Sequence, residues 1–463
     1  MAFADAAGDW NPIHIDAIAA RRLLTGVPVV HGIHAVLKTL EFLASESSGH
    51  RAIDYLDVIF EKPITHNDRM SISAKESSAC LMGQDVELVR MEYGYRPLHV
   101  HSECHTLRPI PRDEPIEHSI EAIASLHGTV DLAPESVVKT VFPDLTQSLN
   151  WRQVALIMAS SRMVGMVAPG LHSLFSEIRL KHSNDPQHSG AELAFTVSRV
   201  DLRFRLVTLS ICGAGLVGTV KAFVRPKPTE QAHMQTLTSL VAADEFAGQR
   251  VLVVGGSRGL GELSAKLLAA GGADVLITYH QGEADAQAVE QSADGASGKV
   301  DIERFDALSP ADTDRAQFEA LARWRPTHLM YFATPPIFGR QTSAFSPSLV
   351  EQFFRVYVTN FGRLAHELAA GGMAGVYYPS SIVLDERPDD MIEYSIAKAA
   401  GEYLCQTFQH QFPSVFFMVP RLPRLATDQT ASLMPVKNLD PTTLMLSHLR
   451  QFASEDAGSR KLV

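Results

Sequence analysis

The chain has 463 residues, of which 46% are hydrophobic and 20% charged, and its formal net charge is −11. This composition is that of a globular protein with roughly three domains, and the acidic balance argues against nucleic-acid binding through a basic surface. No apolar run is long enough to cross a bilayer, and no signal peptide precedes the first polar residues. We therefore expect a cytoplasmic protein without a membrane partner. Four cysteines, Cys80, Cys104, Cys212 and Cys405, form no close pair, which predicts neither disulfides nor a zinc site.

The first motif is Gly8-Asp9-Trp10-Asn11-Pro12-Ile13-His14. Its carboxylate and imidazole lie five residues apart across a Pro-containing turn that cannot continue a helix, so both side chains can converge on one pocket. His31-Gly32 then opens a segment with helical apolar spacing, and an N–H at Gly32 could polarise a carbonyl there. On these residues alone, an Asp/His pair in a loop is more often a capping or surface feature.

The pattern resembles the MaoC-like, hydratase-2 family of hot-dog folds, whose signature is Gly-Asp-x-Asn-Pro-x-His followed by a helix that opens with His-Gly. The resemblance implies reversible hydration of a trans-2-enoyl thioester to the (R)-3-hydroxyacyl thioester. It makes Asp9 and His14 the acid/base pair, with Asn11 orienting them and the Gly32 N–H holding the thioester oxygen. Eliminating water in this way needs two proton-transfer groups and a donor for the enolate-like oxygen.

The family has a further strand and helix before this motif, whereas this chain reaches Asp9 almost at once. The first strand is then missing, supplied by another chain, or lost to a late start codon. Residues 53–73 and 86–106 alternate in polarity, which predicts an antiparallel sheet wrapped on the helix and a first hot-dog over residues 1–110. Within it, His99, His101, Glu103 and His105 share one strand face. We interpret them as a solvated face and expect no metal.

Residues 107–146 predict a connector with a helix near 120–126. Helical spacing over 151–167 and strand patterns over 174–182, 192–201 and 203–224 predict a second hot-dog within residues 111–225. This half has no Asp-x-Asn-Pro-x-His, although its Pro169–Ser173 turn resembles one in MaoC-like repeats. We expect it to be non-catalytic, with His172 a packing or substrate-contact residue. Two prolines within Arg225–Thr229 predict a boundary and a linker over 226–245.

Residues 250–261 change from strand to helix spacing across a glycine-rich corner, which is built for the pyrophosphate of a dinucleotide. The residues expected to contact it are Gly255, Ser257, Arg258, Gly259, Leu260 and Gly261. The second strand, 273–278, ends in Tyr279-His280 without the acid of an NAD site, and Arg258 could meet a 2′-phosphate, so we expect NADP(H). Asp306 is placed to touch the adenine, and Ala333 ends the fourth strand.

Tyr394 and Lys398 lie at i and i+4 on one helix face, so we expect the ammonium to lower the pKa of the phenol. Ser381, thirteen residues earlier, could bond the same carbonyl oxygen. With the glycine corner, these residues resemble the short-chain dehydrogenase/reductase family across residues 246–463. The resemblance makes Tyr394 the general acid/base, Lys398 the residue that holds the ribose, Ser381 the residue that orients the substrate, and Asn360 part of the proton relay.

The chain departs from that family in two places. The usual Asn-Asn-Ala-Gly after the fourth strand is replaced by Phe332-Ala333-Thr334-Pro335, and the C-terminus lacks the usual Val-Asp-Gly-Gly. The turn beside the nicotinamide is therefore expected to be built differently.

Together, the motifs predict a double hot-dog followed by a Rossmann-like doubly wound sheet. They indicate a bifunctional NADPH-dependent 3-ketoacyl-thioester reductase and 3-hydroxyacyl-thioester dehydratase, as a homodimer, acting on acyl groups carried by acyl carrier protein or coenzyme A. An acidic carrier protein would need a local basic patch. Two alternatives stay open: hydration followed by NAD-dependent oxidation, and an acyl-binding scaffold without turnover.

Overall fold

A computed structural model describes residues 2–23, 25–44, 50–66, 68–83, 86–98, 110–310, 315–337, 345–430, 436 and 438–460. Two compact units make up the chain, and they meet in the sequence between Lys227 and Pro228. Among the described helices, none has the length and apolar character needed to cross a membrane.

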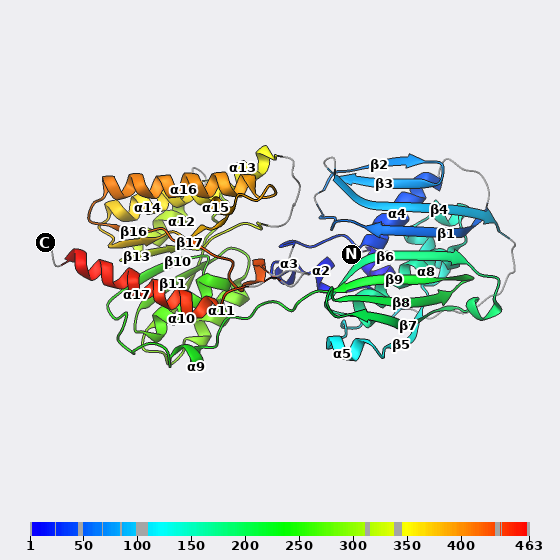
Figure 1. Ribbon diagram of the computed structural model, residues 1–463, viewed down its shortest axis with the longest axis horizontal. Helices are drawn as coiled ribbons and strands as arrows, with labels where there is room; N and C mark the ends of the chain where they lie inside the picture. Colours follow the sequence, from blue (N-terminus) through cyan, green and yellow to red (C-terminus); the bar gives the residue numbers. More distant parts are fainter. Residues whose placement is uncertain are drawn as a thin grey trace. The chain divides into compact units, whose positions relative to one another are not determined.

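The N-terminal unit is built on one antiparallel sheet with the order β2-β3-β4-β1-β6-β9-β8-β7-β5 (Figure 1). Its strands are β1 (Arg51–Phe60), β2 (Met70–Lys75), β3 (Ser78–Gly83), β4 (Val86–Pro97), β5 (His127–Asp131), β6 (Ser173–His182), β7 (Glu192–Asp201), β8 (Leu206–Gly213) and β9 (Leu216–Val224). From the central β1–β6 pair, the order reads β4-β3-β2 on one side and β9-β8-β7 on the other. The sheet therefore consists of two similarly connected halves, which confirms the double hot-dog.

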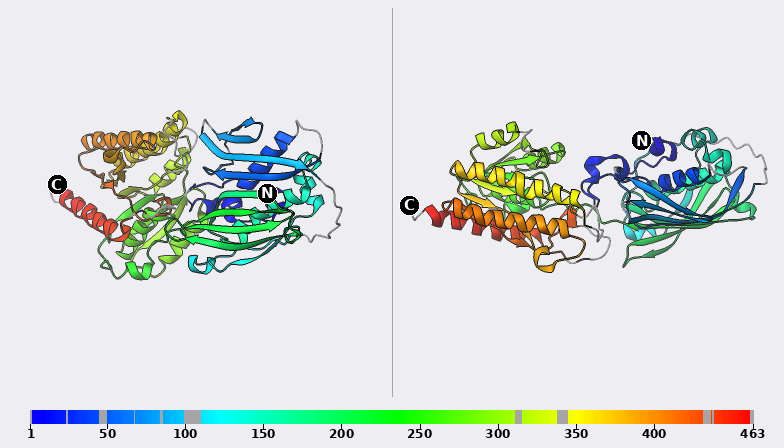
Figure 2. Two further views of the ribbon diagram at one scale, coloured as in Figure 1. Left: turned by 45° about the vertical axis from the view of Figure 1, so that its right-hand side comes forward. Right: turned by 90° about the horizontal axis from the view of Figure 1, so that it is seen from above.

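The two long helices of this unit, α4 (Gly32–Ala44) and α8 (Trp151–Arg162), lie on one face of the sheet (Figure 2). α4 buries Ile33, Val36, Leu37 and Leu40, the spacing of one apolar helix face. α8 is buried from Gln153 to Ser161 and continues into a π-helical turn, η1 (Met163–Val167). The shorter helices are α1 (Ala2–Ala7), α2 (Pro12–Ile15), α3 (Ala17–Ala20), α5 (Ile120–Ile123), α6 (Glu135–Val141), α7 (Leu145–Ser148) and η2 (Pro186–His188).

Several boundaries differ from the predicted ones. The segment 203–224 is a hairpin, because Ala214 and Gly215 both have positive φ (48° and 75°) and turn the chain between β8 and β9. β3 was not predicted, and the first half has no described counterpart of β5 beyond β2. His99, His101, Glu103 and His105 fall outside the described residues, so their predicted strand face stays a prediction.

The C-terminal unit contains a six-stranded parallel sheet with the order β12-β11-β10-β13-β14-β16. Its strands are β10 (Arg250–Val254), β11 (Asp274–Tyr279), β12 (Lys299–Arg304), β13 (His328–Tyr331), β14 (Gly375–Tyr377) and β16 (Phe416–Met418). In chain order, this arrangement is 3-2-1-4-5-6, the doubly wound sheet of dinucleotide-binding folds. It confirms the predicted fold class of this half.

Helices cover both faces of this sheet (Figure 1). Leu252 and Val254 of β10 pack with α14 and α16, whereas Val251 and Val253 pack with α10 and α17 on the opposite face. The helices are α9 (Met234–Leu237), α10 (Gly259–Ala270), α11 (Glu283–Ser292), α12 (Arg315–Arg323), α13 (Pro347–Phe354), η3 (Arg355–Asn360), α14 (Phe361–Ala370), α15 (Val383–Glu386), α16 (Ile392–Gln411), η4 (Asp428–Thr430) and α17 (Pro441–Arg460). Ser381 lies beyond β14, in the short strand β15 (Ser380–Ser381), which pairs with β17 (Arg421–Leu422).

Candidate active sites

Asn11 shapes the loop that carries Asp9. Its Oδ1 accepts the N–H of Ile13 and caps α2, while Pro12 occupies the first helical position. Its Nδ2 donates to the carbonyl oxygens of Gly165 at 2.7 Å and Leu171 at 3.1 Å. Asn11 therefore fixes the loop of the motif against the second half of the double hot-dog.

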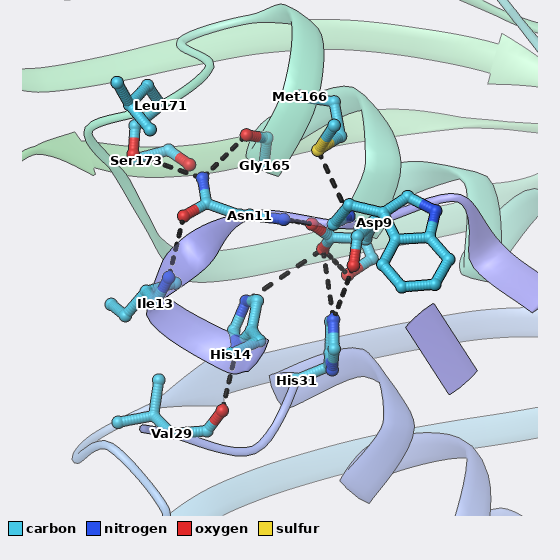
Figure 3. Close-up of polar contacts among 12 residues, drawn as sticks. Asp9, Asn11, Ile13, His14, Val29, His31, Gly165, Met166, Leu171 and Ser173 are labelled. Atoms are coloured by element: carbon cyan, nitrogen blue, oxygen red, sulfur yellow. Dashed lines mark hydrogen bonds and ion pairs between the residues drawn. The ribbon is translucent and has the colours of Figure 1, made fainter. Parts of the chain in front are cut away.

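The Asp9 carboxylate is buried, and the imidazoles of His14 and His31 face it (Figure 3). Its Oδ2 accepts a hydrogen bond from the Ser161 hydroxyl at 2.6 Å, and it lies 4.0 Å from His14 Nε2 and 3.9 Å from His31 Nε2. Burial raises the pKa of Asp9, and the neighbouring His31 and the Ser161 hydrogen bond only partly oppose that rise. Burial therefore makes this carboxyl group hold its proton more tightly than an exposed aspartic acid does.

His14 has the opposite preference. Its Nδ1 lies 2.8 Å from the carbonyl oxygen of Val29, and because a carbonyl only accepts, Nδ1 carries the proton. In the neutral ring, Nε2 then carries a lone pair, and this atom faces Asp9. Burial lowers the pKa of His14 to about 4, so its imidazole is neutral near neutral pH and Nε2 can accept a proton, whereas the pKa of the neighbouring Asp9 is shifted upward.

His31 lines the same site. Its ring stacks on that of His14 with centroids 3.8 Å apart, and its Nε2 lies 3.0 Å from the carbonyl oxygen of Asp9. Burial lowers its pKa to about 3. The possible ligand atoms of Asp9, His14 and His31 lie within 4.8 Å of one another, but His31 Nε2 carries a hydrogen toward a carbonyl and offers no lone pair. This donor arrangement does not suit a metal ion.

Two glycines near the motif leave no room for a side chain. Gly32 begins α4, where its N–H has no intrahelical acceptor, and a Cβ there would lie 2.6 Å from the Phe60 ring. A Cβ on Gly165, in η1, would lie 2.4 Å from Asp9 Oδ1. Any side chain at Gly165 would therefore displace the carboxylate.

We expect Gly165→Ala to lower enoyl-thioester hydration by roughly 10²-fold, because misplacing a reacting group by about 1 Å costs that much. Gly190→Ala is the matched control, since the atom nearest to its Cβ would be 3.8 Å away. Steady-state hydration rates, together with thermal unfolding of both variants, check the prediction. A Gly165→Ala enzyme as active as the control would contradict it.

Sequence reasoning missed Ser161 and Gly165, which lie about 150 residues from Asp9. No motif marks either residue. His172, predicted to pack or to touch substrate, lies with its Nε2 3.2 Å from Glu117.

The glycine corner of the C-terminal unit has no room for side chains at Gly255 and Gly261. Gly255 has φ +82°, and a Cβ there would lie 2.7 Å from the Ala333 nitrogen. A Cβ on Gly261 would lie 2.2 Å from the Gly255 carbonyl oxygen. Gly259, with φ +59°, starts α10. The corner thus brings the turn, the helix start and Ala333 together, as a pyrophosphate site requires.

The other predicted cofactor residues flank this corner. Ser257 is buried in the loop, and Leu260 and Tyr279 pack against the core. Arg258 Nη1 lies 3.8 Å from Asp428 Oδ2, and His280 Nε2 lies 3.5 Å from Asp306 Oδ2. Basic side chains therefore stand on both the glycine loop and the end of β11, where a 2′-phosphate would be recognised.

The predicted catalytic residues Tyr394 and Lys398 are both buried on α16, and the Ser381 hydroxyl hydrogen-bonds the Tyr394 phenol. Lys398 Nζ donates to the carbonyl oxygen of Pro379 at 2.7 Å. It also lies 4.0 Å from the centroid of the Tyr357 ring, a cation–π contact.

The predicted lowering of the Tyr394 pKa is wrong for this structure. Burial raises the pKa of Tyr394 to about 12, and only the Ser381 bond opposes that rise. Burial also lowers the pKa of Lys398 to about 7, and Nζ is directed to Pro379. Burial therefore disfavours the charge of Lys398, and its Nζ donates to the carbonyl oxygen of Pro379 rather than to the phenol, so the predicted effect of the ammonium on Tyr394 is not found.

Asn360 is fully buried, and its Nδ2 donates to the carbonyl oxygens of Ala307 and Ser309 at 2.8 and 2.9 Å. Its Oδ1 is buried without a hydrogen-bond partner in the described structure. Sequence reasoning also missed Tyr357, whose hydroxyl bonds Thr334. The feature of the sequence that could have pointed to this contact is the altered turn after β13, which places Thr334 where the family has a different residue.

Comparison with known protein families finds one match in each of the two units. Residues 1–95 match the model of the MaoC-like domain, and residues 249–415 match that of the short chain dehydrogenase. No curated protein matches the chain in sequence.

Several solved structures are similar to a part of the chain. The angucycline C-6 ketoreductase LanV with bound NADP is 18% identical and matches over 46% of this chain and 90% of its own, with a TM-score of 0.41. A 3-oxoacyl (acyl-carrier-protein) reductase from Agrobacterium tumefaciens C58 with NADP is 19% identical over 45% and 90%, with a TM-score of 0.40. A short-chain dehydrogenase from Sphingobium yanoikuyae in complex with NADPH is 18% identical over 44% and 85%, with a TM-score of 0.39.

Proposed function

The chain joins a MaoC-like domain to a short-chain dehydrogenase domain, and we propose that the two act in turn on one acyl thioester. The C-terminal unit reduces a 3-ketoacyl thioester to the (R)-3-hydroxyacyl thioester with NADPH. The N-terminal unit then removes water to give the trans-2-enoyl thioester. The observation that carries the proposal is the Asp9–His14 pair, 4.0 Å apart and with opposite proton preferences.

In the dehydration step, His14 Nε2 takes the proton from Cα while the carboxylic acid of Asp9 protonates the leaving β-hydroxyl. The Cα–H and Cβ–O bonds break, the double bond forms, and water leaves. The N–H of Gly32 donates to the thioester oxygen, where negative charge develops. Microscopic reversibility gives hydration from the same groups.

The residues of the glycine corner fit NADPH, because Gly255 and Gly261 admit close backbone approach and the Arg258 guanidinium on the glycine loop is a cation that could bind a 2′-phosphate. NADPH supplies the hydride when it is bound. Tyr394 donates its phenolic proton to the ketone oxygen, and Ser381 orients that oxygen with a hydrogen bond. Lys398 lies one helical turn from Tyr394 and holds the ribose.

The direct test incubates the purified chain with NADPH and a 3-ketoacyl thioester, on coenzyme A or on acyl carrier protein, and follows NADPH absorbance and product mass. We expect a product that has gained two hydrogens and then loses one water. Oxidation of 3-hydroxyacyl thioesters with a preference for NAD over NADP would instead support the oxidative direction. Light scattering of the same sample tests the expected homodimer.

Ser161→Ala should change the pH profile of dehydration in a defined direction. The Ser161 bond lowers the pKa of Asp9 because it stabilises the carboxylate. Removing it raises that pKa further, so Asp9 stays protonated to higher pH. Because dehydration uses the acid form, its alkaline limb should move to higher pH. A limb that stays in place, or moves to lower pH, would contradict the assignment of Asp9 as the acid.

A further inference from the structure

Arg225, which directly follows β9, is a buried cation that has no paired anion among the residues the structure describes. The residue is only 6% exposed. Its Nε donates to the carbonyl oxygen of Ser173 at 3.2 Å and its Nη2 to that of Leu171 at 3.1 Å. Its Nη1 is buried and has no hydrogen-bond partner in the described part of the chain.

No described carboxylate compensates this charge. Burial lowers the pKa of Arg225 to about 10, and no neighbouring acid opposes that shift, so the guanidinium is still charged at neutral pH. Other arginines of the same unit reach carboxylates: Arg179 Nε lies 2.7 Å from Glu177, and Arg162 Nη2 lies 3.3 Å from Asp113. Buried charges in proteins are normally paired, so Arg225 is an exception that needs a reason.

Arg225 is adjacent to the dehydratase site. The carbonyl oxygen of Leu171 accepts from both Arg225 Nη2 and Asn11 Nδ2, which joins the guanidinium to the loop of the catalytic motif through one atom. The charge of Arg225 also acts on His14, because burial lowers the pKa of His14 and the nearby guanidinium lowers it further. Two backbone acceptors fix the plane of the guanidinium and leave Nη1 to a third partner.

We propose that Arg225 is an anion-binding subsite of the dehydratase site and that it binds an anionic oxygen group of the acyl thioester. The proposal rests on the proposed function of that site. A carboxylate at the end of the acyl chain and a phosphate of the pantetheine arm have the same chemistry toward a guanidinium. The experiment separates these two sources.

The test measures hydration of three trans-2-enoyl thioesters by the wild type and Arg225→Gln. One is a neutral short-chain N-acetylcysteamine thioester, the second carries the same acyl group on coenzyme A, and the third is an N-acetylcysteamine thioester whose chain ends in a carboxylate. We expect kcat/KM for one charged substrate to fall about tenfold more than for the neutral one, mainly through KM. Excess loss on the coenzyme A thioester assigns the phosphate, and excess loss on the third assigns the acyl carboxylate.

Two further variants guard against a purely structural effect. Arg225→Lys keeps the charge and should restore part of the discrimination. Arg205→Gln removes a similar bond, from Arg205 Nε to the carbonyl oxygen of Val224 at 2.8 Å, and should not change the ratio between charged and neutral substrates. Equal losses on all three substrates in Arg225→Gln, or no loss on any, overturn the subsite.

A wild type that hydrates none of the three thioesters refutes the proposed dehydratase rather than the subsite. Calorimetric binding of butyryl-coenzyme A and of a saturated N-acetylcysteamine thioester ending in a carboxylate then tests Arg225 alone. About tenfold weaker binding of either ligand by Arg225→Gln supports the subsite. Unchanged affinity for both, or no binding of either by the wild type, overturns it.

Discussion

Replacing Asp9 with Asn should lower both dehydration and hydration by roughly 10³-fold, since a positioned general acid contributes about 10²–10⁴. The amide keeps the shape of the carboxyl group and can still accept the 2.6 Å bond from Ser161, but it has no acidic proton to give to the leaving hydroxyl. NADPH-dependent reduction should be unchanged, because every residue assigned to that step lies in the other unit. Separate assays with an enoyl thioester and a 3-ketoacyl thioester measure the two rates.

Asp57→Asn is the matched control for this experiment. Asp57 lies on β1 of the same unit, and burial raises its pKa as it does that of Asp9, but we assign it no part in the reaction. Its variant should hydrate enoyl thioesters at close to the wild-type rate. If Asp9→Asn retained hydration within a few-fold of this control, the acid role of Asp9 would have to be abandoned.

The sequence predicts the dehydratase motif because its geometry is local. Asp9, Asn11 and His14 lie within one turn, and Pro12 and the Asn11 cap dictate how that turn is built. The fold class of each unit is also predictable from the sequence, because apolar residues recur with different periods in strands and in helices. In the C-terminal unit, the glycine corner marks the point where the strand period changes to the helix period. Side chains that share one turn or one helix face are therefore within reach of sequence reasoning.

The partners of Asp9 are beyond that reach. Ser161 and Gly165 come from α8 and η1, in the half that carries no motif, and only packing of the two halves into one sheet brings them to the carboxylate. The half that was predicted to be non-catalytic thus supplies a hydrogen bond and a close backbone contact to the Asp9 carboxyl group. Arg225 shows the same limit. Its position in the sequence indicated only a domain boundary, whereas its contacts place it beside the loop of the motif.

The pKa of Tyr394 shows a second limit. Spacing on α16 correctly places Lys398 on the same helix face, but the sign of a pKa shift depends on burial and on where the ammonium points. Here, burial raises the pKa of Tyr394 to about 12, and Lys398 bonds Pro379. Neither fact is encoded in an i, i+4 spacing.

Replacing Tyr394 with Phe should lower NADPH-dependent ketone reduction by at least about 10³-fold, at the upper part of the range for general-acid catalysis. The ring and its edge-on contacts with Phe353 and Tyr357 are kept, so the fold should survive while the proton donor is lost. NADPH binding, followed by cofactor fluorescence, should stay within a few-fold of the wild type. Enoyl-thioester hydration should be unaffected, which reverses the pattern expected for Asp9→Asn.

Tyr403→Phe provides the control on the same helix, because Tyr403 is 73% exposed and takes no part in the site. Both variants remove one phenolic hydroxyl from α16, so any difference between them reflects the position of that hydroxyl rather than its loss. A Tyr394→Phe enzyme that reduces ketones as fast as Tyr403→Phe would remove the phenol from the mechanism. Ser381 would then be the donor to test, because its hydroxyl is the side-chain group that bonds the Tyr394 phenol in this structure.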